Sequence, residues 1–245
     1  SAADAAVIVV LFSVSYFSYW RGGISIKEVF SDIIVEAPLG SRTKLTLPDG
    51  TLVWLNAGSR ITYSQGFGVG NRKIELIGEG YFEVKRNEEV PFLVKTNSLL
   101  VKVLGTKFNF RDYPDDAEAI VSLSEGKVAL NNLLKKEKEA FLLPNERVVL
   151  NKKNGRMHVE YSTVSNALQW TNGYLFFDEE LLPDVVKELE RSYNVKIQIA
   201  SDTLNTFRFY GNFVHREQNI QEVLEALSAT RKIHYIIEGH NITLY

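Results

Sequence analysis

The stretch RTKLTLPDGTLVWLNAGSRITY, residues 42–63, alternates apolar and polar side chains on both sides of an Asp-Gly pair. Such alternation is typical of β-strands that bury one face. Asp49 and Gly50 can both adopt positive φ, so the pair predicts a hairpin turn between two antiparallel strands. The stretch therefore predicts that this part of the chain is antiparallel β-structure.

Similar alternating segments continue as far as residue 161. They are RKIELIGEGYFEV (72–84), VKVLGTKFNF (101–110), AIVSLSEGKVAL (119–130), AFLLPNERVVL (140–150) and RMHVEY (156–161). Turn residues separate them, and the Asn154-Gly155 pair predicts another hairpin turn before the last segment. The pattern predicts a β-rich domain over residues 22–161, whose antiparallel or solenoid-like strands stack as successive coils.

Residues 162–245 are expected to form a second domain built from a tandem β-α-β repeat. LPDVVKELERSYNVKIQIA (182–200) and NIQEVLEALSATRKIHYIIEG (219–239) each place apolar residues on one helical face and then alternate as a strand. Equivalent apolar residues are 38 positions apart throughout, as in Val185 and Val223, Leu189 and Leu227, and Ile197 and Tyr235. The constant offset predicts two copies of one unit.

The remaining strands of this repeat lie before and after the helices. GYLFF (173–177) and FRFYGNF (207–213) precede the two helices, and NITLY (241–245) is expected to close the sheet as an edge strand. Asn219 and Glu222 have the spacing of a helix-capping box. The prediction is a small sheet with two helices on one face.

The N-terminal stretch AAVIVVLFSVSYFSYW, residues 5–20, contains no charge and ends in aromatic residues. Aromatic residues gather where a transmembrane helix meets water. At about 1.5 Å per residue the run is shorter than a bilayer core of about 30 Å. We expect residues 1–21 to be a truncated transmembrane helix, and the alternative is a hydrophobic helix of the protein core.

Composition excludes several classes of function. The chain has 28 basic and 30 acidic residues with a net charge of -2, and both signs are interspersed, so no nucleic-acid partner is expected. The absence of cysteine excludes disulfides, zinc-thiolate sites and thiol nucleophiles. The Gly-rich stretch GFGVGNRK (66–73) precedes a strand rather than a helix, which argues against nucleotide binding. No cofactor is expected.

No constellation of residues predicts catalysis or a metal site. The four histidines lack ligand-spaced partners. Asp112, Asp115 and Asp116 in RDYPDDAE (111–118) lack the glycine and distal glutamate of a calcium loop, so a solvated turn is expected. Carboxylates such as Glu79 are expected near strand turns without a catalytic partner. The chain is therefore not expected to act as an enzyme on another molecule.

Several of these motifs carry a resemblance to a known family. LTLPDGTLVWLNAGSRITY, IELIGEGYFEV, VLGTKFNF, LSEGKVAL and LLPNERVVL resemble the successive motifs of the FecR family of transmembrane anti-sigma factors and sensors. WTNGYLFFDEELLPDVVKELERSYNVKI (170–197) resembles the domain that follows in Bacteroidetes members, which is similar to the short domain of secretins and TonB-dependent transducers (STN-like). The resemblance extends from about residue 36 to the end of the chain.

The resemblance implies a single-pass protein of the cytoplasmic (inner) membrane, with residues 22–245 mostly periplasmic. Its partners would be the N-terminal signalling domain of an outer-membrane TonB-dependent transporter and an extracytoplasmic-function sigma factor. The sigma factor would bind a cytoplasmic region that this sequence lacks, so the sequence is expected to be a fragment. The alternative is a β-rich carbohydrate or cell-envelope binding protein, which would need Trp54, Tyr63 and Tyr81 on one exposed face.

The Gly105-Thr106 pair has two interpretations. Some members of the family are thought to cut themselves at a Gly-Thr bond in this motif, and here the Thr106 hydroxyl would attack the Gly105 carbonyl. Alternatively, the glycine marks a bulge or kink in the sheet. We favour the structural interpretation and keep autocleavage as a hypothesis.

The strand FRFYGNF predicts a surface for partner binding. Phe207, Phe209 and Phe213 are expected to face the helices, which would leave Arg208 and Tyr210 exposed. An edge strand also offers unpaired backbone groups to another chain. FRFYGNF and NITLY are the candidate edges, and Arg208 and Tyr210 of FRFYGNF are the candidate partner-binding residues. Ordinary aromatic packing beside a solvated face is the alternative.

Overall fold

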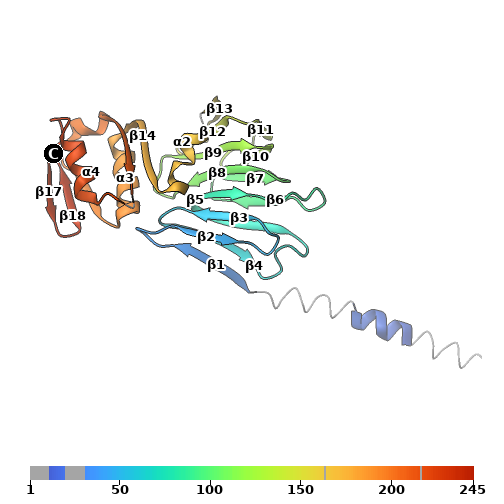
Figure 1. Cartoon of the computed structure of the whole chain (residues 1–245). Coiled ribbons are helices and arrows are strands. Elements are labelled where there is room, and N and C mark those ends of the chain that lie inside the picture. Colours follow the sequence, from blue (N-terminus) through green and yellow to red (C-terminus); the bar gives the residue numbers. More distant parts are fainter. Residues whose placement is uncertain (1–10, 20–30, 163, 216) are drawn as a thin grey trace, which may run out of the picture.

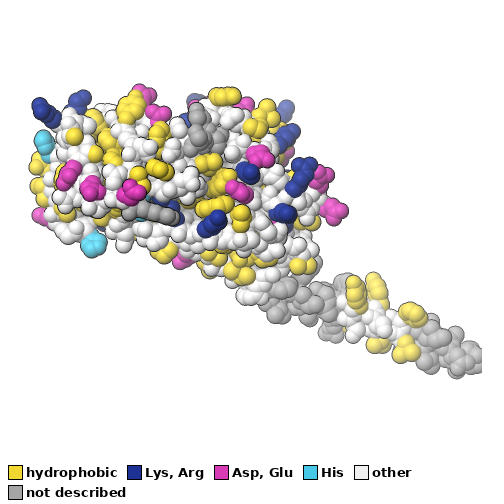
Figure 2. Space-filling model, in the orientation of Figure 1, with side chains coloured by type: hydrophobic (Ala, Val, Ile, Leu, Met, Phe, Trp, Pro, Cys, Tyr) yellow, Lys and Arg dark blue, Asp and Glu magenta, His cyan; other side chains and the backbone are white. Residues whose placement is uncertain are grey.

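The computed structural model describes residues 11–19, 31–162, 164–215 and 217–245. Figure 1 shows a β body, formed by β1–β13, next to a smaller C-terminal unit that contains α3 and α4. A helix at residues 11–19 carries exposed apolar side chains (Figure 2). Within the described residues, no helix is both long enough and apolar enough to cross a membrane. The rest of the predicted transmembrane helix lies outside the described residues.

The β body contains thirteen strands in two sheets that share one strand, β5 (Arg72–Glu83). In sheet A the spatial order is β1 (Asp32–Ala37), β4 (Ser59–Ser64), β5, β6 (Phe92–Lys95), β7 (Leu99–Val103), β10 (Val128–Asn132) and β11 (Ala140–Leu142). In sheet B the spatial order is β2 (Thr43–Thr46), β3 (Leu52–Leu55), β5, β8 (Lys107–Asp112), β9 (Glu118–Glu125), β12 (Glu146–Asn151) and β13 (Met157–Tyr161).

After β5 the chain visits the two sheets alternately, two strands at a time. β6 and β7 lie in sheet A, β8 and β9 in sheet B, β10 and β11 in sheet A, and β12 and β13 in sheet B. Each pair hydrogen-bonds to the previous pair of the same sheet, as β10 does to β7 and β12 to β9. The β-rich architecture predicted from the alternation is confirmed, and the joined sheets form a nearly closed structure (Figure 1).

The hydrophobic core of the β body lies between the two sheets. Phe82 in the sheet B half of β5 has no solvent exposure, and its ring packs against Phe92 of sheet A and Phe108 of sheet B, with centroids 6.2 and 5.1 Å away. The same core contains buried residues from nearly every strand. Side chains that alternate with these residues therefore point to the outer faces of the sheets.

Gly78 marks the point where β5 passes from one sheet to the other. Up to Ile77 the strand pairs with β4 of sheet A, and from Gly78 onward it pairs with β8 of sheet B. Gly78 has φ of +98°, and a Cβ there would lie 2.8 Å from the Cβ of Ser59. Both the backbone conformation and the close approach of β4 therefore require glycine.

The C-terminal unit follows two short turns, α2 (Val164–Ala167) and η1 (Gln169–Asn172). Its elements are β14 (Tyr174–Leu181), α3 (Leu182–Tyr193), β15 (Lys196–Ile199), η2 (Asp202–Thr206), β16 (Arg208–Val214), α4 (Ile220–Ser228), β17 (Tyr235–Glu238) and β18 (Asn241–Leu244). The starts of α3 and α4 differ by the predicted 38 residues. The capping box of Asn219 and Glu222 is also confirmed.

The predicted single sheet of this unit is wrong. The strands form two sheets, β14–β16 and β15–β18–β17, and Figure 1 shows α3 and α4 between them. NITLY forms β18, which is the central strand of the second sheet and not an edge. The cause is that β14 pairs with its own repeat counterpart, β16, while β18 inserts between the other two counterparts. Both sheets contribute buried apolar residues to one core with the helices, although Ile236 and Ile237 of β17 are exposed.

We expect Gly78→Ala to lower the free energy of unfolding by about 3 kcal/mol or more, because positive φ and the contact with β4 both oppose a Cβ. Gly50→Ala is the matched control: Gly50 has a similar φ of +86° but no atom within 4 Å of its hypothetical Cβ. That control should lose about 1 kcal/mol. Urea denaturation measures the free energy of unfolding of both variants. Equal losses would show that the close approach of β4 does not add to the cost of a Cβ at Gly78.

Candidate functional site

The outer face of sheet B carries polar residues that the C-terminal unit covers. Glu79 and Asn109 alternate with core residues and so point outward, yet they are only 5 % and 3 % exposed. Trp170 of η1 donates from Nε1 to Asn109 Oδ1 at 3.2 Å. Asn56 donates to Glu188 of α3 at 3.4 Å. The two units therefore meet through buried polar contacts and not through a shared apolar core.

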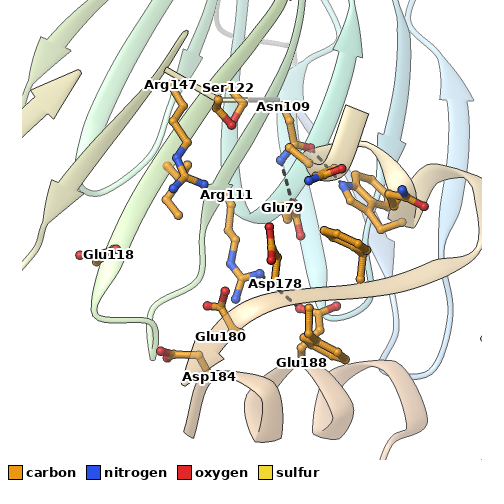
Figure 3. A pocket seen from close by; sticks show the side chains of 18 of the residues that line it. Glu79, Asn109, Arg111, Glu118, Ser122, Arg147, Asp178, Glu180, Asp184 and Glu188 are labelled. Atoms are coloured by element: carbon orange, nitrogen blue, oxygen red, sulfur yellow. Dashed lines mark hydrogen bonds and ion pairs between the residues drawn. The ribbon is translucent and has the colours of Figure 1, made fainter. Parts of the chain in front are cut away.

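Four charged residues at this contact form a closed ring of alternating sign, which we call the junction ring: Arg111, Asp116, Glu188 and Arg191. Arg111 Nε lies 2.8 Å from Asp116 Oδ2, and Arg111 Nη1 lies 3.4 Å from Glu188 Oε2. Arg191 Nη1 lies 3.0 Å from Asp116 Oδ1, and Arg191 Nη2 lies 3.5 Å from Glu188 Oε2. Each charge thus contacts two opposite charges, and each unit supplies two members (Figure 3 shows Arg111 and Glu188).

Arg191 is held by further contacts with the β body. Its guanidinium lies 3.9 Å from the centroid of the Tyr113 ring, and its carbonyl accepts a hydrogen bond of 2.8 Å from the Gly40 amide. The Tyr113 hydroxyl in turn donates to the Ala57 carbonyl at 2.8 Å. These contacts fix the arginine in one orientation over sheet B.

Glu79 lies beside the junction ring but has no ion-pair partner among the described residues. Its carboxylate accepts hydrogen bonds from Asn56 Nδ2 at 2.9 Å and Asn109 Nδ2 at 2.8 Å. Burial raises the pKa of Glu79, because neutral amides compensate a buried charge less than a cation does. Figure 3 shows this carboxylate pointing toward Arg111 and Glu188.

The two carboxylates of the junction ring, in contrast, have lowered pKa values. Burial alone would raise the pKa of Glu188, but Arg111, Arg191 and Arg42 outweigh it and lower the pKa. Burial alone would likewise raise the pKa of Asp116, but Arg111 and Arg191 outweigh it and lower that pKa too. Both groups are therefore ionised in the folded protein at neutral pH.

The expectation of a solvated turn at RDYPDDAE holds for Asp115, whose side chain is 63 % exposed, but is wrong for the other two aspartates. Asp112 and Asp116 are buried, and Asp112 pairs with Lys152 at 2.6 Å. The periodicity of the β body could not show this, because one of the two arginines that contact Asp116, Arg191, belongs to the C-terminal unit. In α3, Glu188 and Arg191 lie off the predicted apolar face, and the three-residue spacing of opposite charges was the only sequence signal.

A groove of about 680 Å³ continues from the ring between sheet B and the C-terminal unit, and we call it the junction groove. One wall is the outer face of β8, β9 and β12, and the other is η1, β14 and the start of α3. Figure 3 shows Arg147 and Ser122 at one end and Glu118, Glu180 and Asp184 at the other. The groove exposes polar and apolar surface in nearly equal shares and falls in the size range of ligand pockets, about 300–1,000 Å³.

Gly105 and Thr106 lie away from this groove, in the crossing from β7 of sheet A to β8 of sheet B. A Cβ on Gly105 would lie 2.7 Å from the Cα of Arg86, so the close approach of another backbone accounts for the glycine. Thr106 is 4 % exposed, and its hydroxyl donates to the Lys127 carbonyl at 3.0 Å. The pair is thus packed where the chain changes sheets.

Arg208 and Tyr210 lie on the outer side of β16, as the alternation predicts. Phe209 is 5 % exposed, whereas Tyr210 is 58 % exposed. Arg208 Nη1 donates to the Glu179 carbonyl, and a hydrogen bond with the Glu179 side chain raises the pKa of Tyr210. Both candidate residues therefore surround Glu179, which has a positive φ of 55° at a bulge in β14.

The three aromatic residues that a carbohydrate platform would need are not together. Trp54 and Tyr81 pack on the outer face of sheet B with centroids 5.4 Å apart, and Lys44 Nζ lies 4.4 Å from the Trp54 ring. Tyr81 is 7 % exposed. Tyr63 lies in sheet A and packs against Phe67. The part of the chain that the structure describes contains no group of three or more potential metal-ligating side chains.

Comparisons with known proteins give the family. Residues 34–129 match the family described as FecR protein, and residues 174–244 match the family described as FecR, C-terminal. Crystal structures of a candidate anti-sigma factor from Parabacteroides distasonis, at 1.65 and 2.50 Å resolution, share 33% identity with the chain, each with a TM-score of 0.80. The alignments cover 87% and 88% of this chain and 98% and 99% of those chains. The chain belongs to the FecR family.

This confirms the resemblance of the motifs, and the FecR membership covers both the β body and the C-terminal unit. No curated protein matches the chain. Since the family consists of anti-sigma factors, the role of a FecR-family chain is regulatory, and the junction ring is a structural feature within a regulator.

We expect Glu188→Gln to lower the free energy of unfolding by about 3 kcal/mol at neutral pH, because two arginines lose a buried partner. The pKa of Glu188 is lowered on folding, so its stabilisation is present above its ordinary value of 4.5 and is lost as pH falls through the folded value. The wild-type melting temperature should therefore fall more steeply than that of the variant between about pH 5 and about pH 3.

Glu225→Gln on the exposed side of α4 is the control for this experiment, and its curve should run parallel to that of the wild type. If Glu188→Gln also gave a parallel curve, the ionised carboxylate would not contribute to the junction ring.

Proposed function

We propose that this chain is the sensing part of an anti-sigma factor that relays the state of an outer-membrane TonB-dependent transporter to an extracytoplasmic-function sigma factor. The observation that carries the proposal is the FecR match over both units, together with the 33% identity to the Parabacteroides distasonis structures. In this proposal the chain acts by binding partners and not by chemistry on a substrate.

The junction supports a relay between the two units. A signal passes between sites only if binding at one differs in affinity between two states of the other. The junction ring and the Gly40–Arg191 bond tie the C-terminal unit to the β body, and the Trp170–Asn109 bond ties the preceding turn η1 to sheet B. A partner that moves the C-terminal unit would therefore also act on the β body.

The proposed location is the inner membrane, with the β body and the C-terminal unit in the periplasm. The helix at residues 11–19 exposes large apolar side chains, among them Phe12 at 73 % and Tyr19 at 84 %. Exposed apolar surface of this kind marks contact with a membrane or a partner. The sigma factor would bind a cytoplasmic region outside this sequence, and nucleic acid is not a proposed partner, since Figure 2 shows both signs of charge interspersed.

The proposed contact with the signalling domain of the transporter involves Arg208 and Tyr210 on β16. Apart from β14, β16 has no strand partner among the described residues. It can therefore offer backbone groups and the exposed pair of side chains to another chain.

The relay is tested by crosslinking the full-length protein, tagged at its C-terminus, in membranes of its native cell. Mass spectrometry should recover a TonB-dependent transporter. Arg208→Glu combined with Tyr210→Ala should reduce this recovery about tenfold, because an exposed anchor pair is lost. Glu238→Gln on β17 is the control. Recovery of glycans or envelope material without a transporter would contradict the relay and favour the carbohydrate-binding alternative.

The same purified protein tests the autocleavage hypothesis. We expect an intact chain in wild type and in Thr106→Val, because the Thr106 hydroxyl is buried and already donates to Lys127. Intact-mass measurement over several days checks this. A fragment that begins at Thr106 in wild type and is missing in Thr106→Val would establish cleavage of the Gly105-Thr106 bond and overturn the expectation.

A further inference from the structure

The junction groove contains the free edge of β14. In the part of the chain that the structure describes, β14 pairs with β16 on one side and with no strand on the other. All eight residues from 174 to 181 line the groove. Side chains of a strand alternate between its two faces, so consecutive residues can line one cavity only if the strand presents its edge to it. The groove is therefore bordered by unpaired backbone N–H and C=O groups.

The groove also contains carboxylates that have no ion-pair partner in the described part of the chain. Asp178 and Glu180 of β14 and Glu118 of β9 line it, and none has an ion pair among the described residues. Figure 3 shows Glu118 and Glu180 near Asp184. Enclosure by the groove raises the pKa of Glu180; the positive charges of Arg111 and Arg147 oppose this rise, and the negative charges of Asp184 and Glu118 add to it. Like charges are thus collected where water is partly excluded.

The nearby arginines form no ion pair with these carboxylates. Arg111 pairs with Asp116 and Glu188 in the junction ring. Arg147 pairs with Glu160 at 2.5 Å, and Arg208 donates to the Glu179 carbonyl. Arg111 and Arg147 are therefore paired within the fold, and Arg208 is hydrogen-bonded to a carbonyl without an ion pair among the described residues. The other charged groups of the groove that lack an ion pair within the described ranges are acidic.

We propose that the junction groove binds an extended peptide segment with basic side chains, which adds as a strand to the free edge of β14. The backbone edge supplies the hydrogen bonds of a strand pair, and the carboxylates of Asp178, Glu180 and Glu118 supply counter-charges for lysine or arginine. Arg208 borders this groove as well as the surface proposed for the transporter, but Tyr210 does not line the groove, and the free strand edge used here belongs to β14 and not to β16. The proposal does not depend on the transporter relay.

Isothermal titration of the 245-residue chain with synthetic peptides tests the proposal. The probe is an acetylated, amidated octapeptide in which lysine alternates with threonine. One comparison peptide replaces lysine by glutamate, and a second keeps lysine but carries N-methyl groups on alternate amides along one edge. We expect the lysine peptide to bind, the glutamate peptide not to bind, and N-methylation on the pairing edge to weaken binding about tenfold.

Variants of the protein locate the site. Asp178→Asn and Glu180→Gln should each weaken binding of the lysine peptide about fivefold, while Glu238→Gln on β17 should leave it unchanged. Absence of binding by the lysine peptide would overturn the proposal. If the N-methylated peptide bound as tightly as the unmodified lysine peptide, strand addition would be excluded. If both carboxylate variants bound the lysine peptide as tightly as the wild type does, this groove would be excluded as the binding site.

Discussion

The strand β5 determines where every other part of the β body can lie. Its first half pairs in sheet A and its second half in sheet B, so the two sheets cannot move apart without breaking a continuous strand. The core between them then follows, with Phe82 packed against residues from both sheets. Gly78 allows the crossing, and Glu79 directly after it is turned toward the C-terminal unit. The crossing therefore positions both the core and the junction.

Alternation in the sequence predicted the strands of the β body, the Asp49-Gly50 hairpin and the exposed position of Tyr210, because a period of two reports which face of a strand is buried. It could not show that RKIELIGEGYFEV belongs to two sheets, since a strand has the same period in either. It also led to the expectation of a solvated turn at RDYPDDAE. The burial of Asp116 depends on Arg191, which lies 75 residues further along the chain. The place of β18 between two other strands was likewise invisible, because periodicity does not encode strand order.

The junction ring shows why the contact between the units is specific. Removing four charges from water costs free energy, and that cost is offset only when each charge meets its partners in good geometry. An apolar contact tolerates sliding, whereas a ring of alternating charges with distances of 2.8 to 3.5 Å fixes one arrangement. Glu79, held by amides beside the ring, adds a carboxylate whose ionisation the same surroundings disfavour. The units are thus joined in one orientation, and this orientation requires charged groups to be buried.

The ring also removes a symmetry from the C-terminal unit. The 38-residue offset relates Glu188 and Arg191 of α3 to Ala226 of α4 and Ala229 at its C-terminal end, which are exposed and carry only methyl groups. A unit made of two equivalent helices could in principle dock either way up. Here the pseudo-symmetric alternative would place methyl groups opposite Arg111 and Asp116, which would keep their ion pair with each other but lose the contacts with Glu188 and Arg191. The duplicated unit can therefore dock on the β body through one of its copies only, and the other copy is left facing solvent.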